Sequence, residues 1–190
     1  MKKYLYKIII LSGIILASTA TLHAQNYLNN RVAIDGFYKR NLGNFSEVWS
    51  NAVGGYISYG IAFPDHNLLI FRSGLISHQL KDDVNYDDAS SIILPLHIGG
   101  RYYFTNQMFM PFVTFMNGLN LVFENTNLEG GKEDKTLVKY AWQVGFGFTI
   151  NLTGNIGVDA SVNYNSHFYT KEAMMTGFEY IFGIAWAFVE

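Results

Sequence analysis

The most regular pattern in the chain runs from Val138 to Ile150. Every second residue is apolar or aromatic, and the residues between them are small or polar. Strict period-two alternation predicts a β-strand whose two faces meet different surroundings. A turn sequence follows at 151–155, and a second alternating stretch begins at Ile156. Together the two stretches predict a long hairpin with one apolar and one polar face.

The same alternation recurs along the chain and predicts about eight strands of ten or so residues, the length that a tilted strand needs to cross a bilayer. Besides the hairpin, the predicted strands cover residues 31–39, 53–63, 69–78, 92–104, 113–123 and 178–188. The registers of the third and fifth strands stay open. Arg72 decides the facing of the third, since a charge does not lie on a lipid face at depth. Asn117 interrupts the apolar face of the fifth, which predicts a β-bulge beside Gly118 or a shifted register.

The connections between these strands alternate between long and short. The long, polar ones are residues 40–51, 81–90, 124–135 and 166–173, and the short ones are 64–67, 105–110 and 151–155. Large loops at one rim and tight turns at the other are typical of an up-and-down barrel with its short turns in the periplasm. Both termini are then expected on the periplasmic side.

Charged and amide side chains gather on the second face of the strands. They are Arg31, Asp35, Lys39, Arg72, His97, Arg101, Lys139, Gln143, Asp159, Asn163 and Glu179. A soluble secreted barrel or sandwich would turn this face to water, whereas a membrane barrel turns it inward. Small residues beside the charges suit a narrow lumen, and aromatic residues near the strand ends suit interfacial girdles. We therefore predict an all-β fold, an eight-stranded antiparallel transmembrane barrel, closed because every backbone group in hydrocarbon must be paired.

The N-terminus has the features of an export signal. A basic start at residues 1–7 precedes an apolar run of about 15 residues, shorter than the ~20 of a transmembrane helix. We expect a signal peptide over residues 1–24 with cleavage after Ala24, or after Ala20, and a barrel domain over residues 25–190. An uncleaved N-terminal anchor is the alternative.

Composition narrows the function classes. Removing residues 1–24 lowers Lys and Arg from 13 to 10 against 15 Asp and Glu, so the mature chain carries about −5, and nucleic acid is not expected as a partner. There is no cysteine, so an exported chain must fold without disulfides. Hydrophobic residues make up 49% of the chain and aromatic ones 16%, which is more apolar surface than so small a globular core would need.

Two segments carry a resemblance to a known family. Residues 93–104, Ile-Leu-Pro-Leu-His-Ile-Gly-Gly-Arg-Tyr-Tyr-Phe, read like a mid-barrel strand, and Gly183, Trp186 and Phe188 fit a C-terminal Gly-x-x-aromatic-x-aromatic pattern. The mature chain resembles the small eight-stranded outer-membrane β-barrel superfamily of Gram-negative bacteria, the OmpX- and OmpA-barrel-like group. It departs from that pattern at Ile181, where a polar residue is expected, and in running past Phe188. The resemblance implies an outer-membrane location after signal-dependent export, contact with outer-membrane lipid and lipopolysaccharide, and recognition by the barrel-insertion machinery through the C-terminal strand.

The inward charges admit two interpretations. Arg72, Arg101 and Lys139 facing Asp159 and Glu179 could form a proton or ligand path. They could equally form a salt-bridge network that fills a lumen too narrow for an aqueous channel, which we favour.

Serine and histidine are candidate hydrolase or acyltransferase residues. Ser166-His167 and Ser77-His78 are adjacent pairs, but neighbours on a strand point to opposite faces. Ser161 offers no Ser–His–acid order either. The acidic stretch 82–88 lacks calcium-loop spacing, and Gly130-Gly131 lacks the strand–helix context of a phosphate loop. We assign no catalytic, cofactor-binding or metal-binding residue and expect no cofactor.

These observations favour a non-enzymatic outer-membrane barrel with a salt-bridged, largely filled lumen and long extracellular loops, serving envelope structure or surface interaction with an unidentified external partner. A small pore or transporter for small or apolar molecules is the alternative. A lipid-modifying barrel enzyme and a soluble secreted carrier rank lower, because the barrel fold by itself does not fix an activity.

Overall fold

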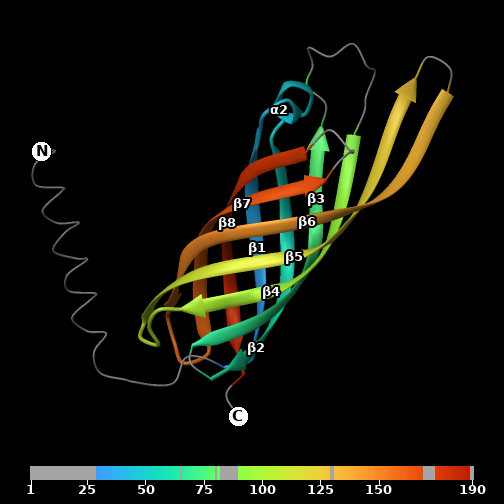
Figure 1. Cartoon of the computed structure of the whole chain (residues 1–190). Coiled ribbons are helices and arrows are strands. Elements are labelled where there is room, and N and C mark those ends of the chain that lie inside the picture. The colour runs from blue at the N-terminus through green and yellow to red at the C-terminus, as the bar shows by residue number, and fades with distance from the viewer. Residues whose placement is uncertain are drawn as a thin grey trace, which may run out of the picture.

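The strands close into a barrel in a computed structural model that describes residues 29–64, 66–79, 81, 90–128, 131–168 and 174–188. Eight antiparallel strands follow one another in sequence order, and β1 pairs with β8 (Figure 1). They are β1 (Arg31–Leu42), β2 (Ala52–Phe63), β3 (Asn67–Gln79), β4 (Ser90–Tyr103), β5 (Phe109–Leu128), β6 (Gly131–Asn151), β7 (Ile156–Phe168) and β8 (Met174–Ala187), with a short helix α2 (Phe45–Val48) after β1. The predicted fold is confirmed.

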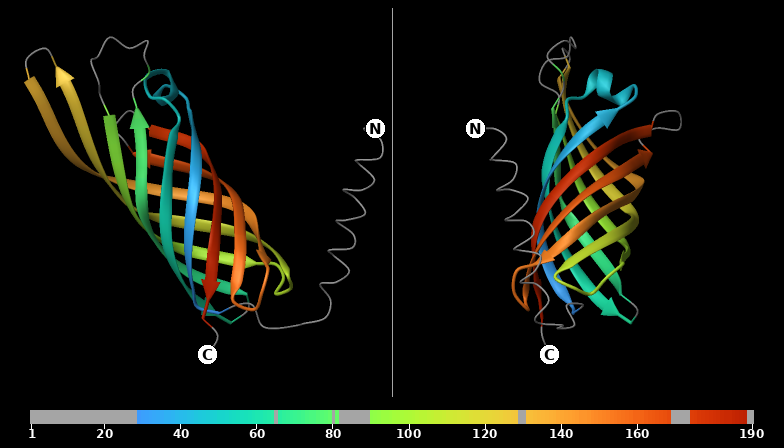
Figure 2. Two further views of the ribbon diagram at one scale, coloured as in Figure 1. Left: turned by 180° about the vertical axis from the view of Figure 1, so that it is seen from behind. Right: turned by 90° about the vertical axis from the view of Figure 1, so that its left-hand side faces the viewer.

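The register determines how wide the interior is. A line of paired residues drawn once around the barrel starts on β1 at Leu42 and returns to β1 at Val32, ten residues away. This stagger tilts the strands against the barrel axis, as Figure 2 shows. An eight-stranded barrel leaves an interior just wide enough for side chains to fill.

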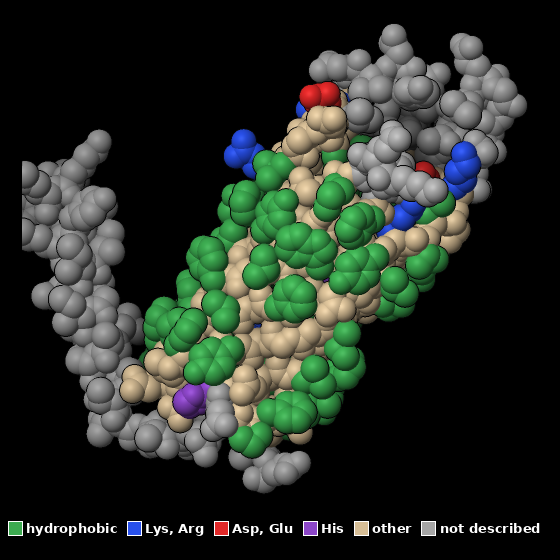
Figure 3. Space-filling model, in the orientation of Figure 1, with side chains coloured by type: hydrophobic (Ala, Val, Ile, Leu, Met, Phe, Trp, Pro, Cys, Tyr) green, Lys and Arg blue, Asp and Glu red, His purple; other side chains and the backbone are tan. Residues whose placement is uncertain are grey.

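The apolar face of every strand points outward. Phe146 and Phe182 are 66% and 67% exposed, whereas the charged face of the same strands is buried inside. Figure 3 shows hydrophobic side chains over the barrel wall and Lys and Arg gathered near one end. Among the described residues, no helix is long and apolar enough to cross a membrane. An apolar outer wall around a polar interior is the arrangement expected of a barrel in lipid, so the predicted facing is confirmed.

The two rims differ. One rim, here the terminal end, carries the short turns and both ends of the described chain, where the Phe188 N–H donates to the Asn30 carbonyl at 2.8 Å. The other, the loop end, carries α2 and the tip of the β5–β6 hairpin (Figures 1 and 2). The predicted short turns therefore lie together at one rim.

Two of the predicted long loops contain regular structure. Residues 40–51 were expected as an irregular connection, but β1 continues to Leu42 and α2 follows a turn in which Gly43 has φ 63°. Residues 124–135 were expected as a charged loop, but the chain stays paired from Glu124↔Lys135 to Leu128↔Gly131. Residues 124–135 are mostly polar. The sequence therefore shows no apolar alternation from which the extension of the two strands could be predicted.

The bulge predicted beside Gly118 is wrong. Pairing of β5 with β4 and β6 is continuous through Asn117 and Gly118, so Asn117 keeps its place on the outer face. The third strand has the predicted facing, with Arg72 buried and Phe71 exposed. Residues 1–24, the acidic stretch 82–88 and Gly130 lie outside the described residues.

Candidate functional site in the barrel interior

The interior is filled by two apolar clusters and three groups of polar side chains. One apolar cluster, toward the loop end, contains Phe37, Ala52, Tyr56, Ile76, Ile93, Val122, Met175 and Ile181. A second, toward the terminal end, contains Leu68, Ile70, Tyr103, Met110, Phe112 and Met116. Charged and amide side chains from all parts of the wall lie between and beside these clusters.

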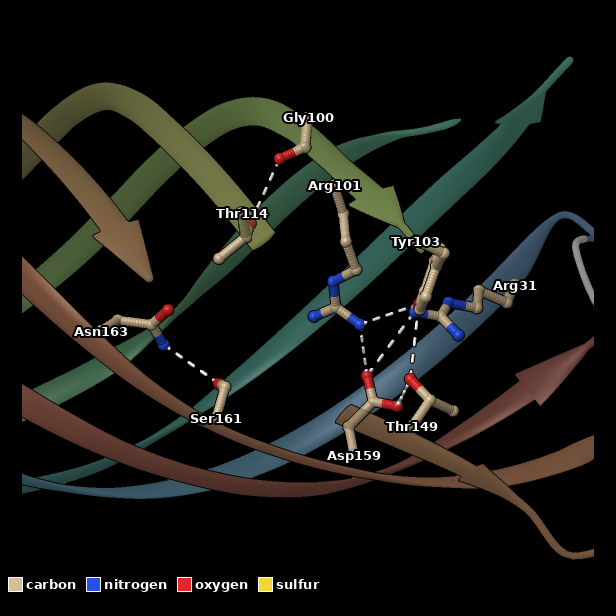
Figure 4. A network of polar contacts seen from close by, with 9 residues as sticks. All are labelled: Arg31, Gly100, Arg101, Tyr103, Thr114, Thr149, Asp159, Ser161 and Asn163. Atoms are coloured by element: carbon tan, nitrogen blue, oxygen red, sulfur yellow. Dashed lines mark hydrogen bonds and ion pairs between the residues drawn. The ribbon is translucent and has the colours of Figure 1, made fainter. Parts of the chain in front are cut away.

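Near the terminal end, three charged side chains form an ion cluster (Figure 4). Arg101 Nη1 lies 2.6 Å from Asp159 Oδ2, and Arg31 Nη2 lies 3.6 Å from the same oxygen. Thr149 donates its hydroxyl to Asp159 Oδ1 at 2.7 Å. Both arginines also donate to the Tyr103 hydroxyl. One carboxylate thus holds two buried guanidinium groups from β1 and β4 against β7.

A second network crosses the middle of the barrel. Arg72 Nη1 donates to Gln143 Oε1 at 3.1 Å, and Gln143 Nε2 donates to Glu179 Oε2 at 2.7 Å. The Tyr56 hydroxyl donates to the same carboxylate oxygen at 3.1 Å, and the Arg72 guanidinium lies 5.0 Å from the centre of the Tyr56 ring. Gln143 therefore bridges a cation and an anion that do not pair directly.

A third group, toward the loop end, is rich in histidine. Asn120 contacts His97 Nε2 at 2.9 Å through Oδ1 and His167 through its amide nitrogen. Lys39 is fully buried and its Nζ lies 3.5 Å from His167 Nε2. These residues come from β1, β4, β5 and β7, so the group ties opposite walls of the barrel together.

Helix α2 covers this end of the interior. The Phe45 ring stacks on Trp49 at 5.9 Å and meets the ring of His78 edge-on at 5.6 Å. Asn41 contacts His78 Nδ1 at 3.4 Å and donates to the Ser50 carbonyl at 2.6 Å. The short helix is thereby attached to inward-facing residues of β1 and β3.

The side chains of the interior leave little open space beside the ion cluster. A cavity beside the ion cluster, lined by Arg31, Ser58 and Asp159 among others, measures about 10 Å³. That is roughly the space needed for a single water molecule. Hydrogen-bonded side chains from opposite walls are packed together around this cavity.

Most of the predicted lumen residues lie where expected. Ten of the eleven are buried inside the barrel, and Lys139 is half-buried at the level where β6 rises above β7. The predicted network is divided: Arg101 pairs with Asp159, and Arg72 is linked to Glu179 through Gln143 and Tyr56. Among the described contacts of the two carboxylates, none is with Lys139.

The serines and histidines that were weighed for catalysis do not come together. Ser161 accepts a hydrogen bond from Asn163 at 3.1 Å, whereas His167 contacts Lys39 and Asn120. Six residues on one strand separate Ser161 from His167, about 20 Å at ~3.3 Å per residue. Ser77 is exposed and His78 buried, on opposite faces as predicted. Within the described residues, no three His, Asp or Glu side chains converge as metal ligands.

Sequence reasoning missed several residues that complete the networks. Tyr56, Tyr103 and Thr149 supply hydroxyls to the buried charges, and Asn120 supplies an amide to His97 and His167. Their inward position in the alternation was the available signal. The two tyrosines have apolar rings and polar tips, so they belong to the apolar clusters and the networks at once.

Comparison with solved structures finds small outer-membrane barrels. Neisserial surface protein A shares 18% identity and a TM-score of 0.58, with 84% of this chain and 97% of that chain covered. Ail, the attachment invasion locus protein of Yersinia pestis, shares 15% identity and a TM-score of 0.59, with 84% and 99% covered. OprG of Pseudomonas aeruginosa shares 14% identity and a TM-score of 0.57, with 85% and 97% covered. No protein-family model matches the sequence, and a search of curated proteins finds no match.

Proposed function

We propose that the chain, which has the fold of the small eight-stranded outer-membrane β-barrels, is a non-enzymatic barrel of the outer membrane whose loop end meets a partner outside the cell. The observation that carries the proposal is the β5–β6 hairpin. Its pairing continues to Leu128↔Gly131, whereas among the described residues the pairing of β4 with β5 extends to Ser90↔Asn125 and that of β7 with β6 to Ala141↔His167. A paired ribbon standing above the rim is a defined surface at the extracellular side.

The packed interior supports a surface role over transport. The ion cluster, the Gln143 bridge and the histidine-rich group each connect opposite walls, and α2 covers the loop end. A barrel filled in this way has the rigidity to hold its loops in fixed positions but offers no wide water path. The similarity to Ail, an attachment and invasion protein by its name, agrees with a surface role without identifying the partner.

The hairpin can be tested directly. Residues 125–134 are replaced by an Asn-Gly turn, which leaves the paired part of β5 and β6 within the barrel unchanged. Cells displaying the wild-type or the shortened protein are compared for retention on plates coated with heparin, on plates coated with a matrix-protein extract and on uncoated polystyrene. We expect wild-type cells to be retained on at least one surface and the shortened form to lose that retention while it still inserts. Equal retention by both forms would refute the proposal.

Conductance distinguishes the proposal from the pore alternative. We expect purified protein in a planar bilayer to give no steady current above a protein-free control. Stepwise conductance from wild-type protein would contradict a filled lumen and would favour a small pore.

A further inference from the structure

Asn117 is a polar residue on the lipid-facing wall. It lies on the outer face of β5, between the exposed side chains of Phe115 and Leu119, and its register partners are Ile98 and Trp142. Its side chain is partly exposed, and no side chain or backbone group of a described residue hydrogen-bonds to it. An amide with no hydrogen-bond partner in hydrocarbon is unfavourable.

The register places Asn117 halfway through the membrane. The line of paired residues that falls from Leu42 at the loop end to Val32 at the terminal end takes eight steps around the barrel, and Asn117 stands at the fourth. The nearest interface is then about 15 Å away, half of a ~30 Å hydrocarbon core. Asn has no long stem with which to reach it. Neither water nor a headgroup can therefore satisfy this amide.

We propose that the wall around Asn117 is the contact between two copies of this chain. Two barrels inserted with the same orientation can be related by a twofold axis along the membrane normal, which sets the same residue of each face to face. A carboxamide carries both an acceptor oxygen and a donor NH₂. Two Asn117 side chains across the axis can thus exchange two hydrogen bonds, and each becomes satisfied by the other.

The surface beside Asn117 is shaped for such a contact. A groove of about 560 Å³ runs over the outer face of β2–β4, between the exposed rings of Tyr59 and Phe71 and the smaller Ser73, and reaches Ile98 next to Asn117. A twofold axis at β5 sets the β4 side of one barrel against the β6 side of the other. The partner's Phe146, one of the most exposed side chains of the wall, then lies on the side that faces this groove.

The contact can be located by crosslinking, because the chain contains no cysteine. Asn117→Cys and, as a control, Ile34→Cys are expressed separately, and outer membranes are oxidised with copper phenanthroline. Ile34 is 58% exposed on β1, the strand opposite β5 in the closed order. We expect a disulfide-linked dimer from Asn117→Cys and at least tenfold less from Ile34→Cys. Equal yields, no dimer, or an adduct with a different protein would overturn the proposal.

The role of the amide itself needs a second measurement. Donor- and acceptor-labelled proteins are reconstituted in lipid vesicles, and energy transfer is measured as the protein-to-lipid ratio is varied. We expect Asn117→Leu to weaken association at least tenfold and Asn117→Gln to keep it within about threefold of wild type. Thr176 is another polar residue on the outer face, and Thr176→Leu should leave association unchanged. Wild-type protein that stays monomeric, or Asn117→Leu that associates like wild type, would overturn the proposal.

Discussion

The carboxylate of Asp159 holds two buried guanidinium groups of the interior. It accepts from Arg101 at 2.6 Å, from Thr149 at 2.7 Å and faces Arg31 at 3.6 Å, and both ion pairs are almost fully buried. Asp159→Asn keeps the shape but removes the negative charge, so two guanidinium groups are left buried beside each other. Removing one partner of a buried ion pair typically costs about 3–5 kcal/mol of unfolding free energy. We expect a loss in that range.

Urea unfolding in lipid vesicles measures this loss. The folded fraction is read at each concentration from the gel mobility of unheated samples, and the variant is compared with wild type. Arg40→Gln is the control, since Arg40 is exposed at the loop end and a surface change of this kind shifts stability by about 0.5 kcal/mol or less. An Asp159→Asn variant within about 0.5 kcal/mol of wild type would refute the reasoning.

A combined replacement separates charge imbalance from shape. Arg31→Met, Arg101→Met and Asp159→Leu together remove the ion cluster and leave apolar side chains beside the Met110 and Phe112 cluster. Replacing a buried ionic group by apolar residues of similar volume is often neutral or stabilising. We expect the triple variant to be more stable than Asp159→Asn, and a triple variant that unfolds at lower urea than Asp159→Asn would contradict this.

Three further predictions concern the wall and the middle network. A Cβ on Gly99 would overlap a backbone oxygen of β5, whereas one on Gly36 meets nothing within 4 Å. Gly99→Ala should lower the free energy of unfolding by about 1–3 kcal/mol in the same urea assay. Equal urea midpoints for Gly99→Ala and Gly36→Ala would contradict the register. Tyr56→Phe removes a 3.1 Å hydrogen bond to Glu179 and should lower stability by about 0.5–1.5 kcal/mol; an unchanged urea midpoint would count against the bond. Val144 is 44% exposed near mid-depth. Val144→Arg should lower the free energy of unfolding by about 2–4 kcal/mol, and Val144→Leu should leave it almost unchanged. A wall facing water would tolerate both substitutions.

The sequence predicted the strands well because each strand lies between two different environments. Where successive side chains point alternately to lipid and to the lumen, as from Val138 to Ile150, the two-residue period is visible in the residue types. From Glu124 to Lys135 the residues are mostly polar, so the two-residue period disappears and the segment looks like a loop in the sequence.

The partners of the inward residues could be predicted less well. Alternation places Arg72 and Glu179 on one face, but it does not reveal that Gln143 on a third strand lies between them. It also does not reveal that the Phe37 ring stacks on Tyr56 with ring centroids 4.4 Å apart. The Phe37 ring lies against Gly54, where the Cβ of a larger residue would overlap it. Such contacts depend on the ten-residue stagger of the whole barrel, which is a property of closure and not of any one strand.

Gel migration of the outer-membrane fraction shows whether the protein is a closed barrel held in the outer membrane. A closed membrane barrel resists SDS until it is heated. We expect the protein in that fraction, with a mobility that differs between unheated and boiled samples. Protein released without detergent, with the same mobility in both samples, would contradict the account and would turn every assigned face around.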